Sequence, residues 1–161
     1  MSNLNPGDVA PAFALPDENR TVHALEGQRG KWTVVYFYPT DDSPGCTTEA
    51  CQFRDLHPDI NVEGATVWGI SPQGAESHQK FKNKHGLTFT LLSDEDHKVA
   101  DQYGAWGLKT FAGKETIGLI RSTVLVDPEG RVVKHWPKVS ADGHAAEVLE
   151  VLREHRATRG A

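Results

Sequence analysis

Two cysteines five residues apart are the side chains of this sequence whose type and spacing could do chemistry. Cys46 follows a Pro-Gly pair, and Cys51 is the only other thiol in the 161 residues. Thiolate is the nucleophilic form of cysteine, and unpaired backbone N–H groups at the start of a helix favour thiolate over thiol. The residues after Cys46 have helix-forming spacing, so Cys46 is a candidate nucleophile in the first turn of a helix.

Both cysteines also have a purely structural interpretation, because free cysteine is often a small buried core residue. For Cys46 the polar loop before it makes burial in an apolar core hard to arrange. For Cys51 the two interpretations are balanced, because it falls within the apolar stripe of its expected helix. A sulfenic acid at Cys46 would last until a thiol condenses with it, and this favours a chemical role for Cys51.

The spacing of the two cysteines restricts how they can react. On a continuous helix, an offset of five residues places the Cα atoms roughly 8 to 9 Å apart. A disulfide tolerates up to about 7 Å. The two sulfurs therefore cannot bond while the helix is intact, and oxidation should demand local unwinding of its first turns.

The elements around Cys46 are predicted by hydrophobic runs. Residues 32–38 form a β-branched and aromatic run ended by Pro39, which is typical of a strand buried on both faces. Residues 46–57 are predicted to be a helix stopped by Pro58, and residues 65–71 a second buried strand. A strand, a helix and a strand in this order connect parallel strands.

The rest of the chain completes an α/β pattern. We expect helices at 76–85 and 96–103, ended by Gly86 and Gly104, and a short strand at 89–92 between them. A turn at 127–130 separates strands at 122–126 and 132–136, which predicts an antiparallel hairpin. Ala145, Val148, Leu149 and Leu152 share one helical stripe. These elements predict one domain over residues 1–161, with a thioredoxin-like fold and a central mixed β-sheet flanked by helices.

Composition narrows the classes of partner. The net charge is −5, the basic residues are scattered, and 38% of residues are apolar. No nucleic-acid or membrane partner is expected. The N-terminus lacks the pattern of a signal peptide, which predicts a cytoplasmic protein. The histidines show no metal-ligand spacing, so neither a metal site nor a cofactor is expected.

The motif around the first cysteine resembles that of a known family. Pro39, Ser43 and Cys46 fit the Pro-x-x-x-Thr/Ser-x-x-Cys motif of peroxiredoxins. Residues 45–51 resemble the bacterioferritin-comigratory-protein, or Q-type, subfamily, in which a second cysteine lies five residues after the first. The similarity extends over nearly the whole chain, through the segments 7–13, 69–72, 91–94 and 120–127.

The resemblance implies a role for each of five residues. Cys46 would be the peroxidatic nucleophile and Cys51 the resolving thiol. Arg121 would be the active-site guanidinium, a forked donor that can hold a peroxide oxygen; without the family context it could equally be a surface arginine in a salt bridge. Ser43 would contact the thiolate and the peroxide, with looser positioning than the threonine of many members. Pro39 would shield the thiolate.

The activity implied by the resemblance is that of a thiol-specific peroxidase. It would reduce hydrogen peroxide and organic hydroperoxides to water and alcohols. A Cys46 sulfenic acid would condense with Cys51, and thioredoxin or a similar dithiol would reduce the resulting disulfide. With both thiols on one chain, the protein is expected to be a monomer.

Two other interpretations remain open at this stage. A general thiol–disulfide oxidoreductase on the same fold is disfavoured because the chain lacks Cys-x-x-Cys. A non-catalytic binding or redox-sensing module is disfavoured because two sulfurs without further ligands make a poor zinc site. Glu49 either faces Arg121 or simply complements the helix dipole, so it stays outside the catalytic set.

Overall fold

The computed structural model describes residues 4–158 and is built on a five-stranded sheet in the order β5-β4-β3-β8-β9. The central strand β3 runs parallel to β4, which is parallel to β5, whereas β8 is antiparallel to both β3 and β9. The predicted mixed sheet is therefore present. Its strands are β3 (Trp32–Phe37), β4 (Ala65–Ser71), β5 (Thr90–Ser93), β8 (Ser122–Val126) and β9 (Val132–Trp136).

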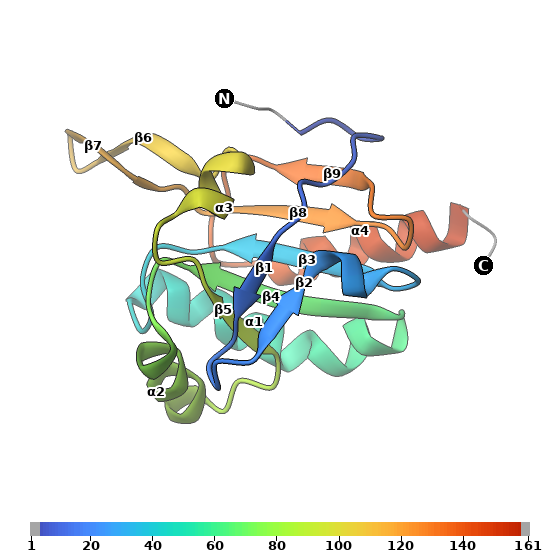
Figure 1. The fold of residues 1–161 in the computed structure, drawn as a ribbon, viewed down its shortest axis with the longest axis horizontal. Helices are drawn as coiled ribbons and strands as arrows, with labels where there is room; N and C mark the ends of the chain where they lie inside the picture. Colours follow the sequence, from blue (N-terminus) through green and yellow to red (C-terminus); the bar gives the residue numbers. More distant parts are fainter. Residues whose placement is uncertain (1–3, 159–161) are drawn as a thin grey trace.

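The sheet is buried on both faces, as the unbroken apolar run of β3 predicted. Val34 and Tyr36 join a core cluster with residues of α1 (Pro44–Val62), α2 (Ala75–His85) and α4 (His144–Thr158). Val35 and Phe37 join a second cluster on the other face, with the N-terminal segment and α3 (Lys98–Gln102). Figure 1 shows α1 and α4 side by side behind the sheet, with β1 and β2 in front of it.

The helix that carries the cysteines is longer than predicted. It passes through Pro58 and ends at Val62, so the expectation that Pro58 stops it was wrong. Proline removes only one intrahelical hydrogen bond, and the turn after it is held by Ile60, whose side chain is completely buried. The C-terminal ends of α2 and α3 agree better with the sequence prediction, since Gly86 and Gly104 take the positive φ angles that end a helix.

Two hairpins and a short helix were not predicted. β1 (Ala14–Pro16) pairs with β2 (Val22–Ala24), and a 3-10 helix (Leu25–Gln28) follows. β6 (Trp106–Phe111) pairs with β7 (Lys114–Leu119) to form a hairpin that projects from the body of the molecule (Figure 1). The hairpin lies directly before Arg121 and so borders the region of the cysteines.

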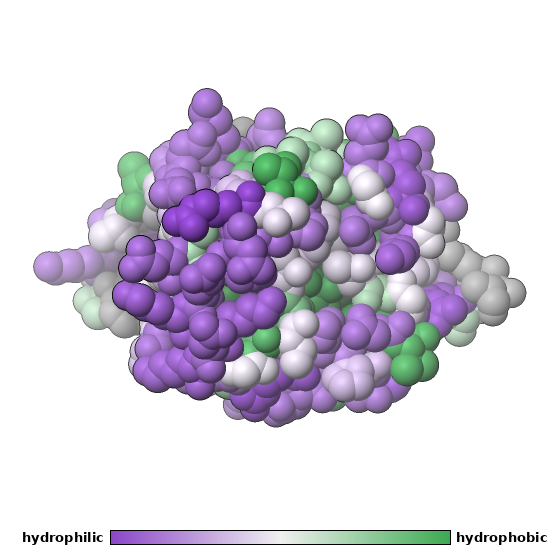
Figure 2. All heavy atoms as spheres, turned by 60° about the horizontal axis from the view of Figure 1, so that its bottom comes forward, coloured by the Kyte–Doolittle hydropathy of each residue, from purple (hydrophilic) through white to green (hydrophobic). Residues whose placement is uncertain are grey.

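The surface is mainly polar on the face that Figure 2 presents, where apolar side chains form small separate patches. Within residues 4–158, no helix is both long enough and apolar enough to cross a membrane.

Candidate active site

Cys46 lies in the first turn of α1, at the carboxyl end of the central strand. Ser43 is the N-cap of this helix, Pro44 begins it, and Cys46 is its third residue. Thr47 donates the first hydrogen bond of the helix, to the carbonyl of Ser43 over 2.8 Å, so the N–H groups of Gly45 and Cys46 precede the helical ladder. Cys46 is only 1% exposed and belongs to the apolar core, so the expectation that its polar loop makes such burial hard to arrange was wrong. The helix begins immediately after the loop and turns Cys46 inward, against the core that holds Ala50.

Arg121 contacts the sulfur of Cys46 from the residue before the neighbouring strand. It directly precedes β8, whose first residue Ser122 is paired with Phe37 at the end of β3. Nη2 of Arg121 donates a hydrogen bond to Sγ of Cys46 over 3.3 Å. A permanent positive charge at this distance stabilises negative charge on the sulfur. The structure thus brings together two residues that are 75 positions apart in the sequence.

Glu49 is the other partner of Arg121, and the sequence interpretation left it out of the site. Nη1 of Arg121 donates to Oε1 of Glu49 over 2.6 Å, and the Glu49 side chain is completely buried. Burial raises the pKa of Glu49 to about 7, although Arg121 opposes this rise. Oε2 of Glu49 has no hydrogen-bond partner among the described residues. A glutamate three positions after the cysteine, on the same helical face, was the available signal.

The guanidinium of Arg121 therefore contacts two groups at once, Glu49 and Cys46. Burial alone would lower the pKa of Arg121, but Glu49 and Cys46 outweigh this effect, and the pKa lies above its ordinary value. The guanidinium thus stays charged beside the sulfur. One of its forked nitrogens is fixed by the glutamate and the other reaches the cysteine, so Glu49 orients the group that contacts Cys46.

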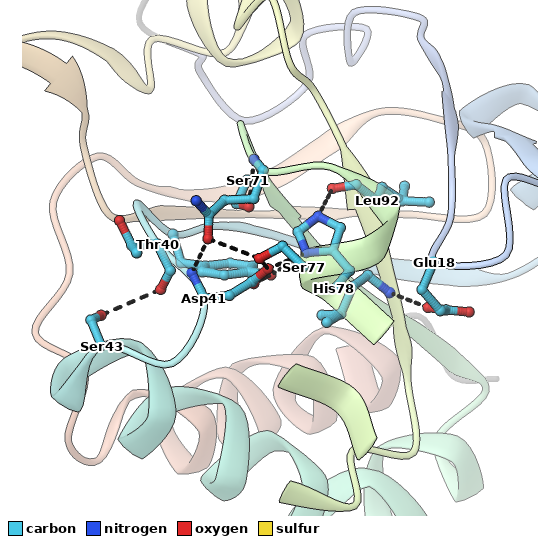
Figure 3. Close-up of polar contacts among 11 residues, drawn as sticks. Glu18, Thr40, Asp41, Ser43, Ser71, Ser77, His78 and Leu92 are labelled. Atoms are coloured by element: carbon cyan, nitrogen blue, oxygen red, sulfur yellow. Dashed lines mark hydrogen bonds and ion pairs between the residues drawn. The ribbon is translucent and has the colours of Figure 1, made fainter. Parts of the chain in front are cut away.

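Ser43 and Pro39 lie on the loop before α1. The hydroxyl of Ser43 donates to the carbonyl of Thr40 over 3.3 Å, as Figure 3 shows, and makes no capping bond to the helix. Pro39 is partly buried and, together with Arg121, lines a depression of about 460 Å³. Further residues around this depression are Leu119, Ile120, Val139 and three lysines.

Cys51 lies further along the same helix and is partly exposed. Both cysteines are free thiols in this structure, and α1 is continuous between them. A disulfide between them cannot form in this conformation, because helical geometry separates their Cα atoms by roughly 8 to 9 Å.

The site shows no arrangement for a metal. Across the part of the chain that the structure describes, no group of three or more histidine, cysteine or acidic side chains is placed to hold a metal ion.

Comparison with known proteins assigns the family. Residues 6–135 match the AhpC/TSA family, which is well over half of the chain. The chain belongs to the AhpC/TSA family of peroxiredoxins. This peroxiredoxin is 46% identical to peroxiredoxin Bcp of Bacillus subtilis, over 92% of this chain and 94% of the relative. It is 41% identical to peroxiredoxin Bcp of Escherichia coli, over 96% of this chain and 99% of that protein.

Solved structures of relatives have the same fold. A PrxQ mutant of Xylella fastidiosa superposes with a TM-score of 0.88 at 36% identity, covering 96% of this chain and 99% of that one. The bacterioferritin comigratory protein of Xanthomonas campestris superposes with a TM-score of 0.84 at 39% identity, covering 89% and 92%. This peroxiredoxin therefore has the predicted thioredoxin-like fold. It is a thiol peroxidase, with a hydroperoxide as substrate and a thioredoxin-like reductant.

Proposed function

We propose that Cys46 is the nucleophile of the peroxidase reaction. Its thiolate attacks one oxygen of the hydroperoxide, the O–O bond breaks, and the departing alkoxide or hydroxide takes up a proton to become alcohol or water. Cys46 is left as a sulfenic acid. The observation that carries this assignment is the hydrogen bond from Arg121 to Sγ of Cys46, at the start of a helix.

Cys51 completes the cycle as the resolving thiol. The first turns of α1 unwind, the sulfur of Cys51 attacks the sulfenic sulfur of Cys46, and water leaves as the disulfide forms. A dithiol protein such as thioredoxin then reduces this disulfide by exchange and is itself oxidised. The intact helix between the two cysteines makes unwinding a required step.

The other residues act on the peroxide. Arg121 stabilises the negative charge that develops on the leaving oxygen, and the hydroxyl of Ser43 turns from Thr40 toward the peroxide. Pro39 and Arg121 border the depression through which the substrate reaches the sulfur. Its lining by Leu119, Ile120 and Val139 accommodates organic hydroperoxides as well as hydrogen peroxide. The related Xanthomonas campestris protein has alkyl peroxide reduction activity.

We further propose that residues 1–161 act as one domain and that the protein works as a cytoplasmic monomer. Both cysteines of the cycle are on one chain and within one helix, so resolution requires no second subunit. A net charge of −5 without a basic cluster gives no basis for nucleic-acid binding.

The test is peroxide-dependent oxidation of NADPH with thioredoxin and thioredoxin reductase, using hydrogen peroxide and an alkyl hydroperoxide. Cys46→Ser should abolish turnover. Cys51→Ser should still reduce one equivalent of peroxide without reductant, but should recycle poorly. Wild-type activity in Cys46→Ser would refute the assignment of the nucleophile, and full recycling in Cys51→Ser would refute that of the resolving thiol.

A further inference from the structure

A buried aspartate–histidine pair joins the loop that leads to Cys46 to helix α2. Oδ2 of Asp41 lies 2.7 Å from Nδ1 of His78, and the two side chains are 4% and 0% exposed. Figure 3 shows the pair between the loop and α2. Tyr38 donates to Oδ1 of Asp41 over 2.6 Å, and Ser77 donates to Oδ2 over 2.7 Å. We call Asp41, His78, Tyr38 and Ser77 the clamp.

The contacts of His78 define where its protons lie. Its Nε2 is 3.1 Å from the carbonyl oxygen of Leu92, which can only accept, so Nε2 carries a hydrogen. Its Nδ1 faces a carboxylate that already accepts two hydroxyl hydrogens. One further proton therefore lies between Nδ1 and Asp41, and the two groups form a charge-assisted hydrogen bond inside the protein. A group of this kind is costly to separate once it is buried.

The clamp connects the active-site loop to elements distant in the sequence. Tyr38 ends the central strand region, Ser77 and His78 lie on α2, and the histidine reaches β5 through Leu92. The backbone N–H of Asp41 also donates to Oε1 of Gln73, over 2.7 Å. Asp41 is thus tied through both its side chain and its backbone.

Asp42, the residue after Asp41, makes further contacts to α2 on the surface of the protein. Asp42 has a φ of 63°, a left-handed conformation that non-glycine residues rarely adopt. Its carboxylate is held by Lys84 and His85 of α2, over 2.6 Å and 2.8 Å. Ser43, the N-cap of α1, follows directly. The first turn of α1 therefore begins from a loop that is fastened to α2 at two successive residues.

We propose that the clamp holds the folded arrangement of Cys46 and that its opening limits how fast Cys51 reaches the Cys46 sulfenic acid. This inference rests on the proposed function of the two cysteines. Asp41 and His78 act here as positioning residues: they touch neither sulfur, but they fix the loop from which the first turn of α1 begins. When that turn unwinds, Ser43 no longer caps the helix, and the loop before it must move as well.

The clamp then determines the fate of the sulfenic acid. In one reaction, the sulfenic acid condenses with the Cys51 thiol to give a disulfide and water. In the other, a second hydroperoxide oxidises it to a sulfinic acid and is itself reduced to an alcohol or water. The second reaction proceeds in the folded arrangement, whereas the first requires the unwound one. A tighter clamp favours sulfinic acid, and a looser clamp favours the disulfide.

The experiment separates the two steps in single turnovers without reductant. Peroxide consumption reports formation of the sulfenic acid, and acid-quenched mass spectrometry follows the disulfide and the sulfinic acid. Asp41→Asn keeps the shape and an acceptor for Tyr38, and its amide can donate to a neutral His78, but the charge is lost. Disulfide formation should be about tenfold faster than in wild type, as expected for one weakened charge-assisted bond. Less sulfinic acid should accumulate at high peroxide.

A matched control exists in the same molecule. Asp17 and His23 form a second pair, also 2.7 Å apart, in the β1–β2 hairpin. Asp17→Asn leaves the backbone bridge to Leu92 in place and changes a side chain that contacts His23 and the backbone N–H groups of Asn19 and Thr21, not the loop before α1. It should therefore leave both rates within about twofold of wild type. Ser77→Ala removes the hydrogen bond that Ser77 donates to Asp41 within the clamp and should accelerate disulfide formation by a smaller factor. This variant keeps the test available if Asp41→Asn folds poorly.

The inference is overturned if Asp41→Asn, or Ser77→Ala where that variant must replace it, forms the disulfide at the wild-type rate. An equal acceleration in Asp17→Asn would also overturn it, because a loss of stability elsewhere in the protein would then be enough to speed disulfide formation. Failure of the proposed function would look different, since wild type itself would then form no disulfide between Cys46 and Cys51.

Discussion

Gly45 and Arg121 lie so close at the start of α1 that a side chain at position 45 would displace the guanidinium. A Cβ added to Gly45 would be 3.1 Å from Nη2 of Arg121, which is tighter than ordinary van der Waals contact. Nη2 is the atom that donates to Sγ of Cys46. The glycine therefore provides the space in which Arg121 approaches the sulfur.

Gly45→Ala should reduce activity while leaving stability intact. Alanine is favourable in a helix, so the free energy of unfolding should stay level or rise. The second-order rate constant of Cys46 with hydroperoxide should fall by about tenfold or more, because the forked donor moves off the sulfur. Stopped-flow peroxide kinetics and urea unfolding measure the two effects. Gly27→Ala is a suitable control, since a Cβ there would meet no atom within 4 Å.

Arg121→Lys should lower the peroxide rate constant by about 10²-fold, the usual effect of losing one prearranged donor. A lysine keeps the charge but cannot contact Glu49 and Cys46 through two fixed nitrogens. Arg153→Lys is the matched control, because Arg153 is a half-exposed arginine that also pairs with a glutamate, Glu63, on another part of the surface. Near-normal peroxide kinetics in Arg121→Lys would mean that positive charge alone suffices.

The buried Glu49 should make stability depend on pH. Burial raises its pKa from 4.5 to about 7, so between these values the native state holds a proton that the unfolded chain has lost. The free energy of unfolding attributable to Glu49 should therefore fall as pH rises through this window, by up to about 3 kcal/mol, and stay constant above it. Denaturant unfolding of wild type and Glu49→Gln from pH 5 to 8 measures the difference. Parallel pH profiles would contradict this expectation.

Oxidation should loosen the first turns of α1. Because Cys46 and Cys51 cannot bond on an intact helix, amides between them should exchange hydrogen faster in the disulfide form than in the reduced form. Amides of α4 provide the internal reference and should exchange equally in both forms. Unchanged protection of α1 after oxidation would exclude an intramolecular disulfide between these cysteines.

The central elements could be predicted from sequence because each carries a continuous apolar pattern. The run from Trp32 to Phe37 and the apolar stripe of α4 directly predict which residues are buried. The β6–β7 hairpin carries no such pattern. Leu119 at its base is buried in the core, but Leu108 and Ile117 are 62% and 71% exposed, so the projecting part has no buried face and its register is set by cross-strand pairing.

The candidate site was predictable only in part. Cys46 and Cys51 share a short motif, and the resemblance supplied Arg121. The clamp could not be found this way, because Asp41 and His78 are 37 residues apart on different elements and each alone looks like a surface residue. Glu49 was visible but ambiguous, since a glutamate in an early helical turn is favourable whether or not it meets an arginine.

The antiparallel placement of β8 beside β3 has a consequence for the newly made chain. Cys46 follows β3, whereas Arg121 is held in place by a strand that begins 76 residues later, at Ser122. During synthesis from the N-terminus, β3, α1 and β4 emerge well before β8, so Cys46 first exists without its guanidinium. Its loop to Arg121 closes only when β8 enters the sheet. Reactivity of Cys46 toward peroxide therefore reports completed folding, and an unfinished chain carries a thiol without that activation.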